Sequence, residues 1–168
     1  MVALNSQFDI LRGWPNSSAV QEDFVIGSAN HPHYMGQWVS LDDSNKDGSM
    51  RTAVALNSTT SDAAAKCFLI IEGKDDYSSR FANRVTCLLG GGYVVRLPQK
   101  GVTADGTSYD ILAAAASSFA PGEEVRVSAG VVTALDAGEA DVDIRRQAVV
   151  GTVLAVDTNA NTLDLLVI

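Results

Sequence analysis

The chain is poor in the residues that build metal, redox and disulfide sites. Only two of its 168 residues are cysteine and two are histidine, and aromatic residues make up 7%. Two cysteines cannot complete a tetrahedral zinc site by themselves, and they exclude a scaffold held together by several disulfides. Hydrophobic residues reach 46%, so alanine, valine and leucine must fill most of an ordinary core.

Basic residues are also scarce. The chain has 12 Lys and Arg against 20 Asp and Glu, which gives a formal net charge of −8. Such a surface repels a nucleic-acid backbone unless a local basic patch dominates. The single adjacent basic pair, Arg145 and Arg146, comes shortly after Asp141 and Asp143. We therefore expect no nucleic-acid partner.

Long apolar runs and a recognisable leader are missing as well. No stretch approaches the ~20 apolar residues of a membrane span, and no basic segment followed by an apolar one opens the chain. We therefore expect no membrane partner. Cys67 and Cys87 each lie in an apolar, strand-like run. We interpret them as buried thiols in a reducing compartment, with a disulfide between neighbouring strands as the alternative.

The sequence does contain a succession of β-type segments. Residues 50–56 alternate between two faces, and residues 67–71 form a continuous apolar run typical of a buried strand. The chain ends on the apolar segment 165–168, which needs burial in a sheet or against a neighbouring subunit. The sequence predicts a mainly β fold, either a β-barrel or a β-sandwich. Further strands are expected at residues 24–26, 37–41, 83–89, 93–97, 125–127, 130–132, 141–144, 149–156 and 163–168.

Turn-forming residues at 42–49 predict that residues 37–56 form a β-hairpin with a long tip. Within that tip, Asp43, Asn45 and Asp47 match the first half of an EF-hand calcium loop. The twelfth position, which should supply a bidentate Glu, is Val54. We interpret the segment as a solvated hairpin tip, with a weak calcium site as the alternative.

One short helix is expected, at residues 109–118, because residues 113–116 are all alanine. The alternative is a strand at residues 109–112 followed by an alanine tail. Residues 99–108 before this segment are expected to form a loop.

The predicted organisation is an extended N-terminal arm, residues 1–23, followed by a β-rich domain, residues 24–168. The three glycines at positions 90–92 either turn a hairpin or divide the domain into two lobes, residues 24–89 and 93–168.

Motifs that carry catalytic chemistry are absent from the sequence. There is no G-x-S-x-G elbow, no phosphate-binding loop and no dinucleotide fingerprint. His31 and His33 form the one histidine pair, but Pro32 between them indicates an extended surface loop without a third ligand at a supporting spacing. We expect no enzyme and no cofactor, with a metal-dependent enzyme built on these histidines as a distant alternative.

The candidate partner-binding residues are apolar anchors in the arm and the loop that follows it. The arm anchors lack sustained helical or strand spacing, so they can dock either on their own domain or on a neighbour. The full set is Phe8, Ile10, Leu11, Trp14, His31, His33 and Tyr34.

The segment Gly91-Gly92-Tyr93-Val94-Val95-Arg96-Leu97, followed by Phe119-Ala120-Pro121-Gly122-Glu123-Glu124-Val125-Arg126-Val127, resembles strands of the head decoration (cement) proteins of tailed bacteriophages. Residues 149–157 and 162–168 are similar to the terminal strands of that family. The resemblance covers residues 91–168, about half of the chain, and rests on composition and strand order. It implies a β-barrel or β-sandwich on the capsid exterior that forms trimers and clamps the major capsid protein.

The leading hypothesis is therefore a non-catalytic virion structural protein, made in the host cytoplasm, that binds the major capsid protein and stabilises the shell. The first alternative is a tail-tube or adaptor ring subunit. The second is a carbohydrate-binding β-sandwich, which would need exposed aromatic residues on one face. Its candidate residues are Trp14, Tyr34, Trp38, Tyr77 and Tyr93.

Overall fold

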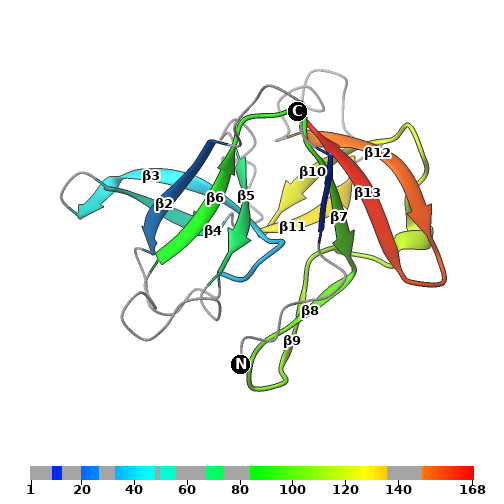
Figure 1. Cartoon of the computed structure of the whole chain (residues 1–168), viewed down its shortest axis with the longest axis horizontal. Helices are drawn as coiled ribbons and strands as arrows, with labels where there is room; N and C mark the ends of the chain where they lie inside the picture. Colours follow the sequence, from blue (N-terminus) through cyan, green and yellow to red (C-terminus); the bar gives the residue numbers. More distant parts are fainter. Residues whose placement is uncertain are drawn as a thin grey trace.

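The computed structural model shows a mainly β protein, which confirms the predicted fold class (Figure 1). It describes residues 9–12, 20–26, 33–47, 50–55, 67–73, 84–135 and 149–168, with side chains at residue 24 and in 33–40, 67–73, 84–135 and 149–168. Within these ranges no helix is long and apolar enough to cross a membrane. The strands are β1 (Asp9–Arg12), β2 (Val20–Ile26), β3 (Trp38–Asp47), β4 (Met50–Ala55), β5 (Cys67–Glu72), β6 (Arg84–Leu89), β7 (Val94–Pro98), β8 (Lys100–Val102), β9 (Ser108–Asp110), β10 (Glu124–Ser128), β11 (Val131–Ala134), β12 (Val149–Asp157) and β13 (Thr162–Val167).

Strands β2 to β6 form a closed barrel in the order β2-β4-β3-β5-β6. The antiparallel pair of β3 and β4 confirms the predicted hairpin. Its ladder extends to the pair Asp47 and Met50, so the tip is shorter than the sequence predicts. The register shifts between Asp42 and Lys46, where an irregularity takes up the extra residues of β3. Barrel closure leaves this sheet without an open edge.

The second sheet has six strands in the order β1-β7-β13-β12-β10-β11. The C-terminal strand β13 lies between β7 and β12, where Leu163 and Leu165 are fully buried. The burial predicted for the C-terminal segment is thus confirmed for Leu165 and Val167, whereas Ile168 is 58% exposed. Gly91 lies against the end of this strand, because a Cβ at that position would come within 2.6 Å of the Ile168 carbonyl carbon.

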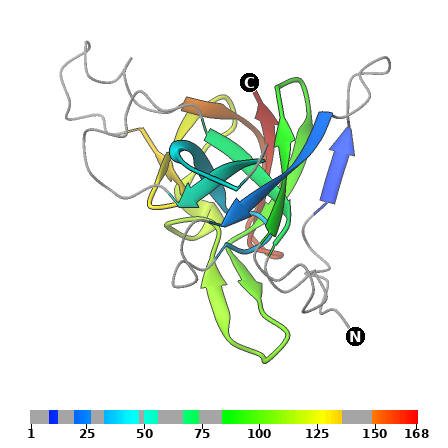
Figure 2. The same cartoon turned by 90° about the vertical axis from the view of Figure 1, so that its left-hand side faces the viewer.

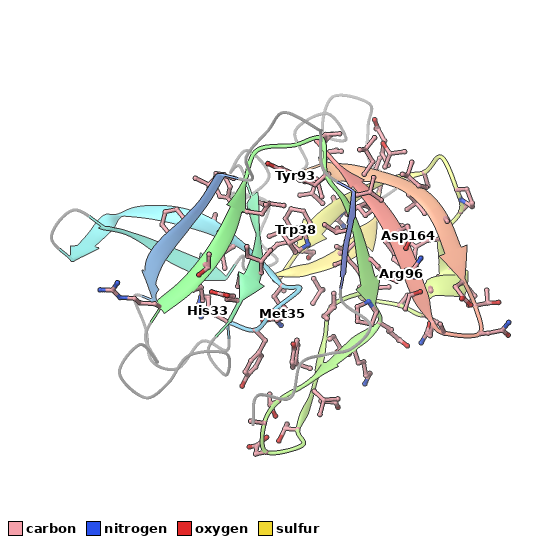
Figure 3. The ribbon with its side chains drawn as sticks, viewed as in Figure 1. His33, Met35, Trp38, Tyr93, Arg96 and Asp164 are labelled. Atoms are coloured by element: carbon pink, nitrogen blue, oxygen red, sulfur yellow. The ribbon has the colours of Figure 1, made fainter. Side chains whose placement is uncertain are left out.

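One core joins the barrel to the six-stranded sheet. Successive side chains of a strand point to opposite faces, so Leu69 of β5 faces the six-stranded sheet while Ile70 lies in the small cluster inside the barrel. Trp38 lies between the two sheets (Figure 3), and its backbone N–H donates to the Gly130 carbonyl at 2.9 Å. Buried residues shared across this junction are Trp38, Leu69, Ile71, Leu88, Tyr93, Val95, Leu97, Val125, Val127, Val132, Leu163 and Leu165.

The two cysteines lie on adjacent strands but on opposite faces. Cys87 belongs to the cluster inside the barrel, whereas Cys67 packs against the core shared with the six-stranded sheet. Neither forms a disulfide. The pleat of the sheet excludes the alternative of a bond between neighbouring strands, because the two side chains point apart.

The prediction of a helix at residues 109–118 is wrong. Strand β9 takes its start, and only Ala116–Ser118 form a short 3₁₀ helix. The backbone N–H groups of Ile111 and Leu112 donate to the Gln99 carbonyl, and that of Ala113 donates to Val132. Long-range hydrogen bonds therefore replace the helical ones that alanine propensity favours locally.

The prediction that residues 1–23 form an arm outside the β-rich domain is also wrong in two places. Asp9–Arg12 form β1 at the edge of the six-stranded sheet, and Val20–Ile26 form β2 of the barrel. The loop expected at residues 99–108 is likewise wrong, because it contributes β8 and the start of β9.

Candidate binding site

Two of the predicted arm residues lie on β1, which is the edge strand of the six-stranded sheet among the described residues. Ile10 and Leu11 belong to β1, whose partner is β7, with Ile10 opposite Val95. Phe8, Trp14 and His31 lie outside the described residues, as do the side chains of Ile10 and Leu11. The arm thus supplies the outermost strand of the sheet through its own backbone.

A charged pair lies next to this edge strand. Arg96 of β7 stands opposite Asp9 on one side and Asp164 on the other. Its guanidinium binds the Asp164 carboxylate bidentately, with Nε to Oδ1 at 2.8 Å and Nη2 to Oδ2 at 2.9 Å (Figure 3). The Arg96 side chain is 43% exposed, so solvent screens this pair and limits it to roughly 1 kcal/mol or less. The main effect of the ion pair is to hold the two charged side chains in one arrangement on the surface of the sheet.

His33 is buried, with 1% of its surface exposed, so the expected surface histidine is wrong. The chain at Gly73 passes directly over this segment. A Cβ at Gly73 would lie 2.8 Å from the His33 carbonyl oxygen and 2.6 Å from the Met35 nitrogen. At this exposure the His33 side chain, labelled in Figure 3, does not form a contact surface.

Tyr34, the remaining predicted site residue, is half-buried in a junction that the sequence did not reveal. Its ring stacks on Tyr109 with centroids 4.4 Å apart and an interplanar angle of 25°. The Tyr109 hydroxyl donates to the Met35 carbonyl at 3.0 Å. Gln37 accepts from the Tyr34 backbone N–H through Oε1 at 3.1 Å and donates through Nε2 to the Asp110 carbonyl at 3.3 Å. This tyrosine junction fixes residues 33–37 to β9.

The junction supports a β-hairpin formed by β8 and β9, which is a separate two-stranded sheet. Figures 1 and 2 show it extending away from both larger sheets. Signals for it were present in the sequence: Asp105-Gly106 is a turn-forming pair, and Tyr109 is a good strand former. Gly101 and the small residues around it weakened that signal.

Asp105 orders the hairpin tip. Its Oδ1 accepts from the Thr103 hydroxyl and from the Thr107 backbone N–H, the latter at 3.0 Å. The hydrogen bond from Thr103, followed by those from Thr107, lowers the pKa of Asp105 below its ordinary value of 3.8. Because the folded pKa is the lower one, the stabilisation is present above pH 3.8 and is lost as the pH falls through the folded value. At neutral pH the carboxylate is thus in the ionised form that accepts these hydrogen bonds.

The carbohydrate-binding alternative from the sequence loses support here. Trp38 and Tyr93 are buried at 1% and 4% exposure, so they form core and not a flat sugar-binding platform. Over the described ranges, no three His, Cys, Asp or Glu side chains are grouped to hold a metal ion. The side chains of the calcium-like tip, Asp43 to Asp47, lie outside the described ones.

No protein-family model, curated protein or solved structure matches this chain. Its function is therefore inferred from the sheet edge, the tyrosine junction and the hairpin.

Proposed function

We propose that the protein is a virion structural protein that decorates the outside of a tailed-phage capsid and stabilises it without catalysis. One observation carries the proposal. The four segments that resemble decoration proteins contain β7, β10, β12 and β13, and these are neighbours in the order β7-β13-β12-β10. The resemblance therefore corresponds to one continuous sheet with one shared core, instead of scattered local likenesses.

The proposed mechanism is burial of apolar surface together with strand pairing at the edge of this sheet. Strand β1 is only four residues long, and its outer side has no strand partner within the described residues. Such an edge presents backbone N–H and C=O groups that another chain can pair with. Phe8 and Trp14 flank β1 in sequence, and each large apolar side chain buried against a partner contributes about 1.5–3 kcal/mol.

The acidic charge of the chain is compatible with this location. A net charge of −8 keeps the protein soluble and repels packaged nucleic acid, which leaves the outer surface of a shell as the favoured place. In the same proposal the protein assembles as a trimer around positions where neighbouring major capsid protein subunits meet.

The arm is tested by truncation. Deleting residues 1–23 would remove the start of β2 from the barrel, so the deletion should stop at residue 18. We expect this variant to stay folded by circular dichroism but to lose co-sedimentation with expanded, undecorated capsid shells of its own phage. A control that lacks only residues 1–7 keeps Phe8 and β1 and should still bind.

One result would contradict the role of the arm, and another would contradict the decoration function. Undiminished binding by the variant without residues 1–18 would rule out the arm as the clamp. Failure of the intact protein to bind the shells would rule out the decoration function itself.

A further inference from the structure

We propose that the β8–β9 hairpin is a second contact element, whose tip docks into a cationic recess of a shell subunit. The identity of this partner rests on the proposed function. The hairpin itself is identified from its exposure, its rigidity and its charge.

The hairpin contributes little to the core of the protein. Lys100, Val102, Ser108 and Asp110 share one face and are all exposed, and Val102 has 48% of its surface accessible. Residues 104–107 at the tip are exposed as well. Packing of the two main sheets therefore does not account for this projection (Figure 2).

The base of the hairpin is nevertheless held firmly. An isolated two-stranded hairpin is marginally stable in water, so an ordered one needs support from outside. The Tyr109 ring covers Gly101, its partner across the ladder, leaving no room for a Cβ there. Tyr109 also stacks on the ring of Tyr34, donates to the carbonyl of Met35 and packs against the main core. The ring thus ties both strands to residues 34–35.

The tip is ordered before any partner arrives. The Thr103 backbone N–H donates to the Thr107 carbonyl at 2.9 Å, and the Gly106 N–H donates to the Thr103 carbonyl at 3.0 Å. The Asp105 carboxylate adds its two hydrogen bonds to this turn. A pre-organised tip loses little conformational entropy on binding, which favours affinity.

Charge identifies the kind of partner. At the base of the exposed face, Lys100 pairs with Asp110 at 3.4 Å. Asp105 is the remaining charged residue of the hairpin, and no cation pairs with it among the described residues. The tip therefore presents a net negative charge close to an apolar Val102. A recess lined by Lys or Arg complements it, whereas a second copy of this chain, at −8, repels it overall.

The test compares two exposed aspartates, each of which accepts two hydrogen bonds within its own turn. Asp157, in the turn between β12 and β13, accepts from the backbone N–H groups of Asn159 at 2.9 Å and Ala160 at 3.0 Å. We expect Asp105→Lys to weaken binding to expanded shells by about tenfold or more, through like-charge repulsion in the recess. Asp157→Lys, which changes net charge equally, should stay within about twofold of the unmodified protein.

A second variant separates charge from tip folding. Val102 pairs with Ser108, so residues 103–107 can be replaced by Asn-Gly, a two-residue turn that fits an antiparallel pair. This shortened hairpin should keep its thermal midpoint and bind shells as weakly as Asp105→Lys does. Raising the salt concentration should weaken binding of the unmodified protein more than binding of the shortened variant.

Each outcome bears on a separate claim. Shell binding that is equal for the unmodified protein, Asp105→Lys and the shortened hairpin overturns the hairpin contact and leaves the decoration function standing. Equal weakening by Asp105→Lys and Asp157→Lys also overturns it, because net charge would then be responsible. If the unmodified protein does not bind shells, both proposals fail.

Discussion

At the scale of single residues, Tyr109 has the most consequences for function. Its ring lies between Tyr34 and Gly101, and its hydroxyl reaches the Met35 carbonyl. The side chain therefore connects a loop near the barrel to a hairpin that has no core of its own. Backbone position alone would leave that hairpin as a marginal two-stranded ribbon.

Two substitutions separate the contributions of Tyr109. Tyr109→Phe keeps the stacked ring and removes one hydrogen bond, which should cost about 0.5–1.5 kcal/mol in unfolding experiments. Tyr109→Ala removes the ring as well and should accelerate amide hydrogen exchange in β8 and β9. Amides of β13 serve as the internal control and should exchange as before. Unchanged exchange in the hairpin of Tyr109→Ala would show that the junction does not support it.

At the scale of elements, the C-terminal strand β13 holds the six-stranded sheet together. It pairs with both β7 and β12, and Leu165 is fully buried in the shared core. Leu165→Ala should lower the free energy of unfolding by about 2–5 kcal/mol, because it leaves a cavity among packed side chains. Chemical denaturation followed by circular dichroism measures this directly.

A leucine on the neighbouring strand is the matched control. Leu154 on β12 is 44% exposed, so Leu154→Ala should change stability by only about 0.5 kcal/mol. A similar cost for the two leucines would mean that β13 is not central to the core.

Some strands could be predicted from local sequence patterns and others could not. Strands β5, β7 and β13 were predictable because their apolar runs or alternation appear within a few residues. Strand β1 was not, since Asp9–Arg12 become a strand only by pairing with residues more than 80 positions later. The contacts of Tyr34 were hidden for the same reason, because Tyr109 is distant in sequence. His33 was predicted to be exposed because it follows Pro32, but the folded chain buries its side chain and packs Gly73 against the backbone of this segment.

At the scale of the whole molecule, barrel and sheet share one core, and the proposed contact elements adjoin a single strand. Strand β1 pairs with β7, and β8 begins two residues after β7 ends (Figure 1). The arm and the hairpin can therefore engage one continuous partner surface. Two such elements next to one strand suit a protein that clamps neighbouring subunits, which is the central claim of the proposed function.

The most direct test is electron cryomicroscopy of capsid shells prepared with and without the protein. Decoration predicts difference density on the outer surface, as trimers where capsid subunits meet, with the hairpin and the N-terminal strand facing the shell. Density confined to the tail, or a shell surface identical in both preparations, would contradict it.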